Sequence, residues 1–90
     1  LVEAQQRLVA ILLNNKRGDA AIAIAKEVQR QRKDSAIGFI LEAESLLSIG
    51  KRTEAVKLYE EAYKREKSAA SILRLHNAHV AANQPQEATR

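Results

Sequence analysis

The sequence predicts an all-α protein built as an array of antiparallel helix hairpins, and three observations carry this prediction. Apolar residues recur at helical spacing in five separate stretches of the chain. The residue pattern also returns at a shift of 33 or 34, a period that fits two helices joined by short turns. Finally, three Gly and one Pro are too few turn residues for the many short strands of a β-sandwich or barrel.

Size and composition set the kind of core. The 90 residues form at most one compact unit, because single domains usually span roughly 100 to 200 residues. The 22 Leu, Ile and Val and 16 Ala, against three aromatic residues, predict an aliphatic and closely packed interior. The chain starts without Met and stops in mid-pattern, so we interpret it as a fragment of a longer protein. No apolar run approaches the ~20 residues of a membrane span.

The first two helices are expected around residues 8–12 and 21–28. The second of these stretches places Ala21, Ile24, Ala25 and Val28 on one face, at the spacing of an amphipathic helix. Asp19 comes just before it and is a suitable N-cap, because a short carboxylate can accept the free N–H groups of a first turn. These two helices predict a hairpin over residues 2–33.

The third and fourth helices are expected around residues 39–46 and 55–63. Ser35 can cap the third helix, and Gly50 can supply the left-handed turn that follows it. The fourth stretch carries the full i, i+3, i+4, i+7, i+8 stripe, formed by Ala55, Leu58, Tyr59, Ala62 and Tyr63. Together the two helices predict a hairpin over residues 35–67.

A fifth helix is expected around residues 72–79, and it opens a third, truncated hairpin over residues 69–90. Ile72, Leu75 and His79 lie at helical spacing, and Ser68 can cap the helix. Pro85 stands where a sixth helix would begin, a position at which its missing N–H costs little.

Comparison of the chain with itself identifies the repeat. Ser68-Ala69 repeats Ser35-Ala36, and Glu87-Ala88 repeats Glu54-Ala55, both at a shift of 33. In the other direction Ala55 corresponds to Ala21 at a shift of 34. Such periods are typical of stacked helical arrays, in which each hairpin buries its apolar face against the next.

The middle unit resembles the tetratricopeptide repeat. That family has a bulky apolar residue and then a small one in its first helix, and an Ala, aromatic, Ala series in its second. The matching residues, expected as the structural core, are Phe39, Ala43, Leu46, Ala55, Tyr59 and Ala62, with Gly50 at the turn. The sequence departs from the family pattern at Glu42, where Leu is expected, and at Lys67, where Pro is expected. The flanking units match less well, with Gln5 in the bulky place of the first and His76 in the small place of the third.

A narrower resemblance concerns residues 29–31, 35–42 and 75–78. These runs are similar to tetratricopeptide-rich lipoproteins associated with PEP-CTERM protein sorting and exopolysaccharide export in Gram-negative bacteria. This resemblance implies a lipid-anchored scaffold on the periplasmic face of a membrane, although this chain contains neither an anchoring Cys nor a signal peptide. Without the resemblance, a cytoplasmic location is expected.

The tetratricopeptide resemblance also implies a right-handed superhelix with a concave wall formed by the first helix of each unit. Its residues here are Glu3, Gln6, Ala10, Leu13 and Asn14; Ile37, Ile40, Glu44, Leu47 and Ser48; and Ala70, Leu73, Asn77, Val80 and Ala81. Because this concave wall is more aliphatic than charged, we predict that a partner peptide or helix docks on it through apolar burial. The alternative is a structural spacer, in which these residues pack against neighbouring repeats or another copy of the chain. The clamp that some family members use for C-terminal carboxylates has only Arg74 and Asn77 as echoes, so tail binding is not expected.

Glu42 is the residue most at odds with its expected place. A carboxylate on a packing face must find hydrogen-bond donors or lose its charge, and His76 on the adjoining first helix is a candidate donor. The sequence therefore suggests a partly buried Glu42–His76 pair that fixes the repeat register. The alternative is that Glu42 reaches solvent or a backbone N–H.

Other chemistries are not expected. His76 and His79 could share a helix face but lack Cys and a close carboxylate, so we predict structural histidines and no metal. Neither a nucleophile elbow nor a Gly-rich phosphate loop is present, so the sequence predicts a non-enzyme without cofactors. The cations at residues 26–33 and 64–67 fall at the ends of second helices, where they complement the helix dipole. Without aromatic residues among them, we do not expect nucleic-acid binding.

Overall fold

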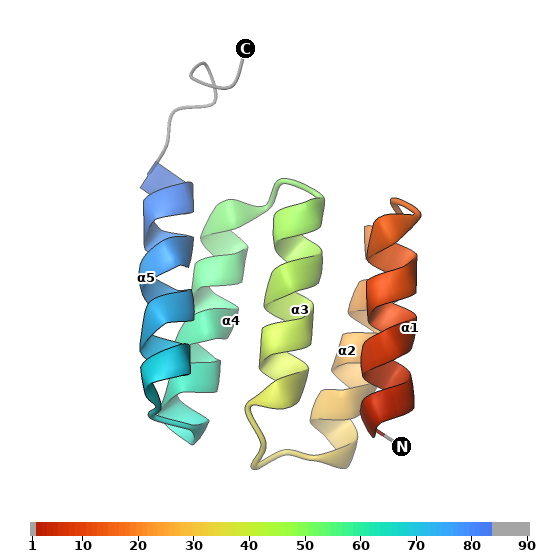
Figure 1. The fold of residues 1–90 in the computed structure, drawn as a ribbon, viewed down its shortest axis with the longest axis horizontal. Helices are drawn as coiled ribbons and strands as arrows, with labels where there is room; N and C mark the ends of the chain where they lie inside the picture. Colours follow the sequence, from red (N-terminus) through yellow and green to blue (C-terminus); the bar gives the residue numbers. More distant parts are fainter. Residues whose placement is uncertain (1, 84–90) are drawn as a thin grey trace.

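A computed structural model describes residues 2–83 of the chain, and all the secondary structure in that range is helical. The helices are α1 (Val2–Asn14), α2 (Gly18–Gln31), α3 (Ile37–Ser48), α4 (Arg52–Arg65) and α5 (Ala69–Asn83). Successive helices run in opposite directions and are joined by short loops (Figure 1). The predicted all-α class and its five helices are confirmed. Pro85 and the rest of the expected sixth helix lie outside the described residues.

The loops show which local signals set the helix ends. Gly50 has φ +83°, so the predicted left-handed turn after the third helix is confirmed. Ser68 Oγ accepts the backbone N–H of Ser71 at 3.1 Å, which is N-cap geometry. Ser35 Oγ accepts the N–H of Ile37 at 3.2 Å. Asp19 is not the N-cap that the sequence suggested, because α2 already begins at Gly18 and Asp19 lies in its first turn.

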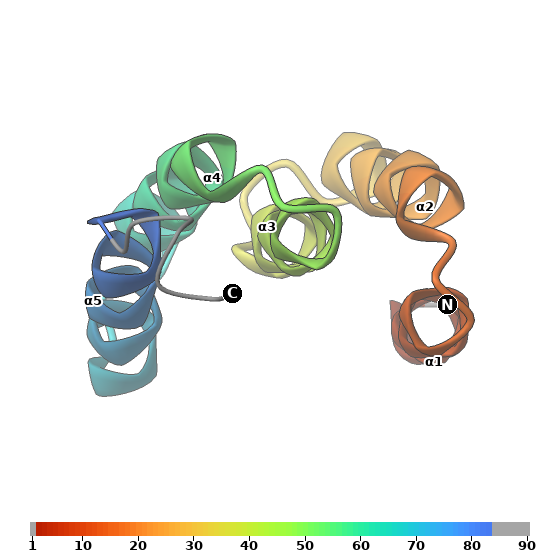
Figure 2. The ribbon, with the colours of Figure 1, turned by 90° about the horizontal axis from the view of Figure 1, so that it is seen from above.

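The helices form an arch, which Figure 2 shows from above. In that view α2 and α4 lie on the outer side, α1 and α5 form the two feet, and α3 lies between them. The first helices of the three units therefore face the hollow side. The two halves are not equivalent: α1 approaches α3, but over residues 2–83 no α-carbon of α5 lies within 8 Å of one in α3.

The core consists of two clusters, one for each complete hairpin. The first is formed by Val9, Ala21, Ala25 and Val28 of α1 and α2, and Leu41 of α3 belongs to it. The second joins the buried residues of α3 and α4 with Ala78 of α5. The first helix of the next unit thus contributes to the core of each hairpin, as expected for stacked repeats.

The residues expected as the repeat core gather in this second cluster. Ala43 and Ala55 are fully buried, and Leu46, Tyr59 and Ala62 are nearly so. Phe39 is partly buried and packs against the same cluster. The Arg65 guanidinium lies 4.0 Å above the Phe39 ring, and its Nε donates to the Lys33 carbonyl at 3.0 Å. One arginine therefore covers the lower end of the second hairpin and ties it to the preceding loop.

Glu42 has a different partner from the one suggested by the sequence. Its Oε1 accepts a hydrogen bond from Gln29 Nε2, which also donates to the Gly38 carbonyl at 3.2 Å. His76 is exposed and makes no ion pair with Glu42, so the suggested Glu42–His76 pair is wrong. The physical reason is that Glu42 lies on the face of α3 that packs against α2, where Gln29 supplies the donor.

Candidate partner-binding wall

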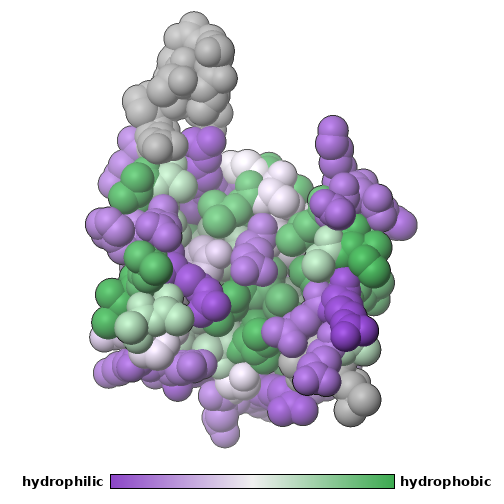
Figure 3. Space-filling view, viewed as in Figure 1, coloured by the Kyte–Doolittle hydropathy of each residue, from purple (hydrophilic) through white to green (hydrophobic). Residues whose placement is uncertain are grey.

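The concave wall lies on the hollow side of the arch, which is the side seen in Figure 3. Hydrophobic side chains gather there over α3, between the two end helices, with hydrophilic groups among them. From α1 the wall includes Gln6 and Leu13, both partly buried, and the exposed Ala10. This face is therefore a mixed surface with its most apolar part over the middle helix.

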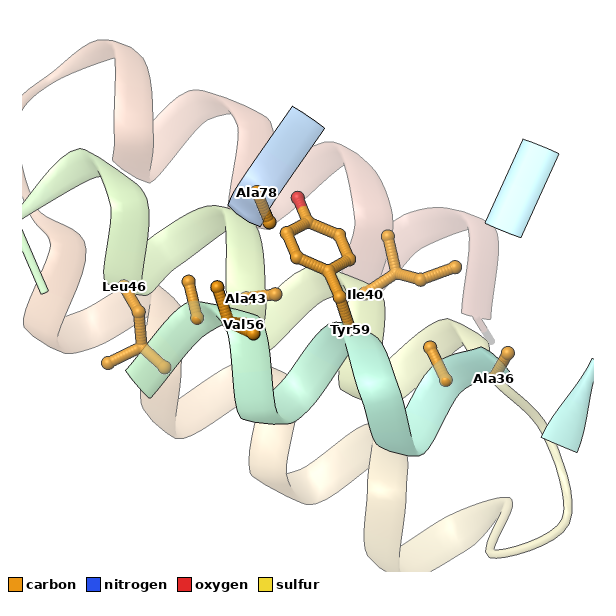
Figure 4. Packing of buried hydrophobic residues seen from close by; sticks show 9 residues of the cluster. Ala36, Ile40, Ala43, Leu46, Val56, Tyr59 and Ala78 are labelled. Atoms are coloured by element: carbon orange, nitrogen blue, oxygen red, sulfur yellow. The ribbon is translucent and has the colours of Figure 1, made fainter. Parts of the chain in front are cut away.

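On α3 the predicted wall residues differ in their exposure. Ile37 is partly buried and packs against the first core cluster, and Leu47 is partly buried against the second. Glu44 is exposed. Ile40, by contrast, is only 7% exposed and belongs to the second core cluster, so its expected place on an open wall is wrong. Figure 4 shows the reason, because the Tyr59 ring of α4 lies beside Ile40.

On α5 the predicted wall residues are open to solvent. Leu73 is 58% exposed and Val80 is 46% exposed, and Asn77 between them is also exposed. These values decide which side chains can meet a partner without repacking. The available aliphatic surface comes from Leu73 and Val80, with Ile37 and Leu47 beneath.

Three polar groups come close together where α3, α4 and α5 meet on this side. Glu44 is exposed by area, yet the surrounding protein removes enough water from its carboxyl to raise its pKa, against the attraction of Arg74. Burial also raises the pKa of Tyr59 to about 12, and the Glu44 charge adds to this rise while Arg74 opposes it. None of the hydrogen bonds and ion pairs found among residues 2–83 involves the Glu44 carboxylate, the Tyr59 hydroxyl or the Arg74 guanidinium. The wall thus holds polar groups that a ligand could engage.

Exposed large apolar side chains are concentrated on the two end helices. Leu8 and Ile11 of α1 are 42% and 56% exposed, and Ile72 of α5 is 54% exposed. Ala4, Leu8 and Ile11, here called the α1 stripe, stand 34 residues before Gly38, Glu42 and Ser45. Gly38 and Glu42 are the residues of α3 that Gln29 of α2 contacts. The α1 stripe therefore occupies positions that pack against a preceding second helix in the middle unit.

A shallow hollow lies between α4 and the end of α5, lined by Val56, Glu60 and His79 among others. His79 Nε2 lies 3.9 Å from Glu60 Oε2, an ion pair only when the histidine is protonated. No group of three or more His, Asp or Glu side chains suited to a metal ion is found within residues 2–83. In the same range, none of the helices has the length and apolar character that crossing a bilayer requires.

The cations at the ends of the second helices are largely engaged within their own helices. Arg30 pairs with Glu27, and Lys64 and Arg65 pair with Glu61. Arg65 Nη1 also donates to the Glu61 carbonyl at 3.1 Å, in the last turn of α4. This contact is the direct form of the dipole complement expected there.

Comparisons with known proteins leave the family open: no family model, no curated protein and no solved structure matches this chain. The tetratricopeptide and lipoprotein resemblances therefore stay predictions.

Two features of the site were not anticipated. Tyr59 was expected only as a core residue, whereas its hydroxyl comes under the influence of Glu44 and Arg74 on the hollow side. A Tyr in place of Phe in a repeat core was the available signal, because a buried phenol usually needs a route to a polar group. Gln29 was not singled out as the partner of Glu42, since only the packing of α2 on α3 brings them together.

Proposed function

We propose that the chain is a tetratricopeptide-like array that acts as a protein–protein interaction scaffold and binds a partner peptide or helix on its concave wall. The observation that carries this proposal is the open aliphatic surface of Leu73 and Val80, which faces the same hollow as Leu47 and Glu44. Isolated exposed aliphatic residues are common, but several gathered in one hollow favour an interaction site. An array of first helices offers such a site to an extended or helical segment.

The tetratricopeptide-like part of the proposal is supported by equivalent packing at equivalent positions. Ser71 and Ala78 stand 33 residues after Gly38 and Ser45, and all four are buried. Lys16 has φ +60° and stands 34 residues before Gly50, which has φ +83°. Each of these pairs repeats a small residue or a left-handed turn at the interval found in the sequence.

The proposal is tested with a displayed library of random 16-residue peptides, selected on the full chain. Peptides that bind should lose roughly tenfold or more in affinity when Leu73 and Val80 are both changed to Asp, because the apolar contact is removed. Both residues are exposed, so the double variant should keep its helical circular dichroism and its melting temperature. Ala23→Asp, at an exposed position of α2, is the matched control and should bind normally. Failure to select any peptide, or unchanged affinity in the double variant, would contradict the proposal.

The α1 stripe supports a second candidate function, that of a structural spacer within a longer solenoid. Its positions are those covered by a second helix in the middle unit, and terminal repeats that end an array normally have a polar outer face. As a spacer the chain would select no peptide on its concave wall. The export context implied by the lipoprotein resemblance is compatible with either candidate and stays a prediction.

A further inference from the structure

The charge of the concave wall differs from that of the chain as a whole. The protein carries 15 Lys and Arg against 11 Asp and Glu, and its net charge is +4. Among the fifteen wall positions, however, Glu3 and Glu44 are charged and none is Lys or Arg. Arg74 is the nearest cation from α5 that acts on Glu44, and it stands beside the wall positions rather than among them. A basic protein thus has an acidic centre in its hollow.

Glu44 is the wall carboxylate with the greatest need of a partner. No Lys, Arg or His nitrogen of the described chain lies within 4.0 Å of it, although ion pairs at that distance are found for Glu27, Glu60 and Glu61. Surrounding atoms desolvate its carboxyl, and the attraction of Arg74 does not offset that effect. A carboxylate held in this state gains more from a cationic donor than a fully hydrated one does.

The apolar neighbours of Glu44 indicate what should flank such a cation. Leu47 lies one turn further along the same face of α3, and Leu73 and Val80 of α5 border the hollow from the other side. Tyr59 adds a hydroxyl oxygen, which can accept a second hydrogen bond from the same donor.

We infer that the partner of this wall is a peptide segment that places a lysine or arginine side chain against Glu44 and apolar side chains against Leu47, Leu73 and Val80. This inference rests on the proposed function and specifies its ligand. A partner carboxylate is disfavoured at the same place because it would approach Glu44. The polarity is therefore opposite to that of a carboxylate-binding clamp.

The test uses the displayed 16-residue peptide library on the full chain, followed by synthetic peptides in which the selected cation is replaced by norleucine or glutamate. Selected peptides should be enriched in Lys or Arg among apolar residues. Glu44→Gln should weaken the cationic peptide roughly three- to tenfold and leave the norleucine peptide unchanged. Arg74→Gln should strengthen the cationic peptide, because it removes a repelling charge. Both substitutions are at exposed positions, so the fold should be kept.

The outcomes separate this inference from the function on which it rests. Peptides that need Leu73 and Val80 but ignore Glu44→Gln would overturn the inference and leave the scaffold intact. Selection of acidic peptides that weaken with Arg74→Gln would also overturn the inference. A library that yields no binder at all would contradict both.

Discussion

At the junction between α2 and α3, Gly38 allows such a close approach that an added β-carbon would lie 2.7 Å from the Gln29 backbone nitrogen. The Gln29 side chain then bridges the Gly38 carbonyl and Glu42. At the junction between α4 and α5, the equivalent positions hold Ser71 and Leu75, and Ser71 is buried while Leu75 packs against the core cluster. The comparison shows that the repeat conserves a small residue and a packed face, while the chemistry between the helices changes from polar to apolar.

The largest expected difference between the junctions follows from their close contacts. Gly38→Ala should lower the free energy of unfolding by about 2 kcal/mol, because its β-carbon meets the Gln29 backbone and forces the helices apart. Ser71→Ala should cost less than about 1 kcal/mol, since it only removes a hydroxyl that lies 3.3 Å from Ser68 Oγ. Urea denaturation of both variants measures the difference. Equal losses would mean that the two junctions pack alike.

The polar bridge should be the next largest effect. Gln29→Leu removes the donor to the Gly38 carbonyl and to Glu42, which is partly buried, so a loss of about 1–2 kcal/mol is expected. Gln31→Leu is the matched control, because that exposed amide bonds only with Glu27 of the same helix. Its unfolding free energy should stay near that of the parent chain. A Gln29 variant as stable as the control would remove the bridge from the account of this junction.

The loops that lead into the two junctions should differ by a smaller amount. Ser68 accepts the N–H of Ser71 in the N-cap position, so Ser68→Ala should cost about 1 kcal/mol. Ser35 accepts the N–H of Ile37 two residues on, and α3 takes its N-cap from Ala36, so Ser35→Ala should cost less. Thermal unfolding of the two variants, followed by circular dichroism, gives the order. A larger loss for Ser35→Ala would reverse it.

The smallest expected effect is a pH dependence centred on Glu44. Desolvation raises its pKa in the folded state, so the folded protein holds this proton more tightly than the unfolded chain does. The Glu44 contribution to stability should therefore rise as the pH falls through the raised pKa. Glu44→Gln should remove that rise and be slightly stabilising at pH 7.

Glu27 and Glu61 act in the opposite direction and define the background. Hydrogen bonds from Arg30 and Arg65 lower their pKa values, so the stability they contribute is present above their ordinary pKa and is lost as the pH falls. The difference between Glu44→Gln and the parent chain, measured by urea denaturation from pH 3 to pH 7, isolates Glu44. A difference that does not vary with pH would contradict the assignment.

Much of the fold was predictable because local signals and periodicity agree. The stripe from Ala55 to Tyr63, the cap at Ser68 and the turn at Gly50 each depend on neighbouring residues, which the sequence displays directly. The pairing of helix faces was less predictable. Ile40 was assigned to an open wall from its repeat position, but the orientation of α4 places Tyr59 beside it. The partner of Glu42 was missed for the same reason, because Gln29 becomes its neighbour only after α2 packs on α3.

The helix that carries Leu73 and Val80 has a consequence for the size of partner that the protein can accept. The backbone of α5 comes close to that of α4 and of no other helix within residues 2–83, whereas α1 is braced by both α2 and α3. The molecule therefore resembles a caliper with one fixed jaw and one adjustable jaw. A tilt of α5 on α4 would change the gape while leaving the first hairpin undisturbed, so thicker and thinner segments could be gripped by moving a single helix.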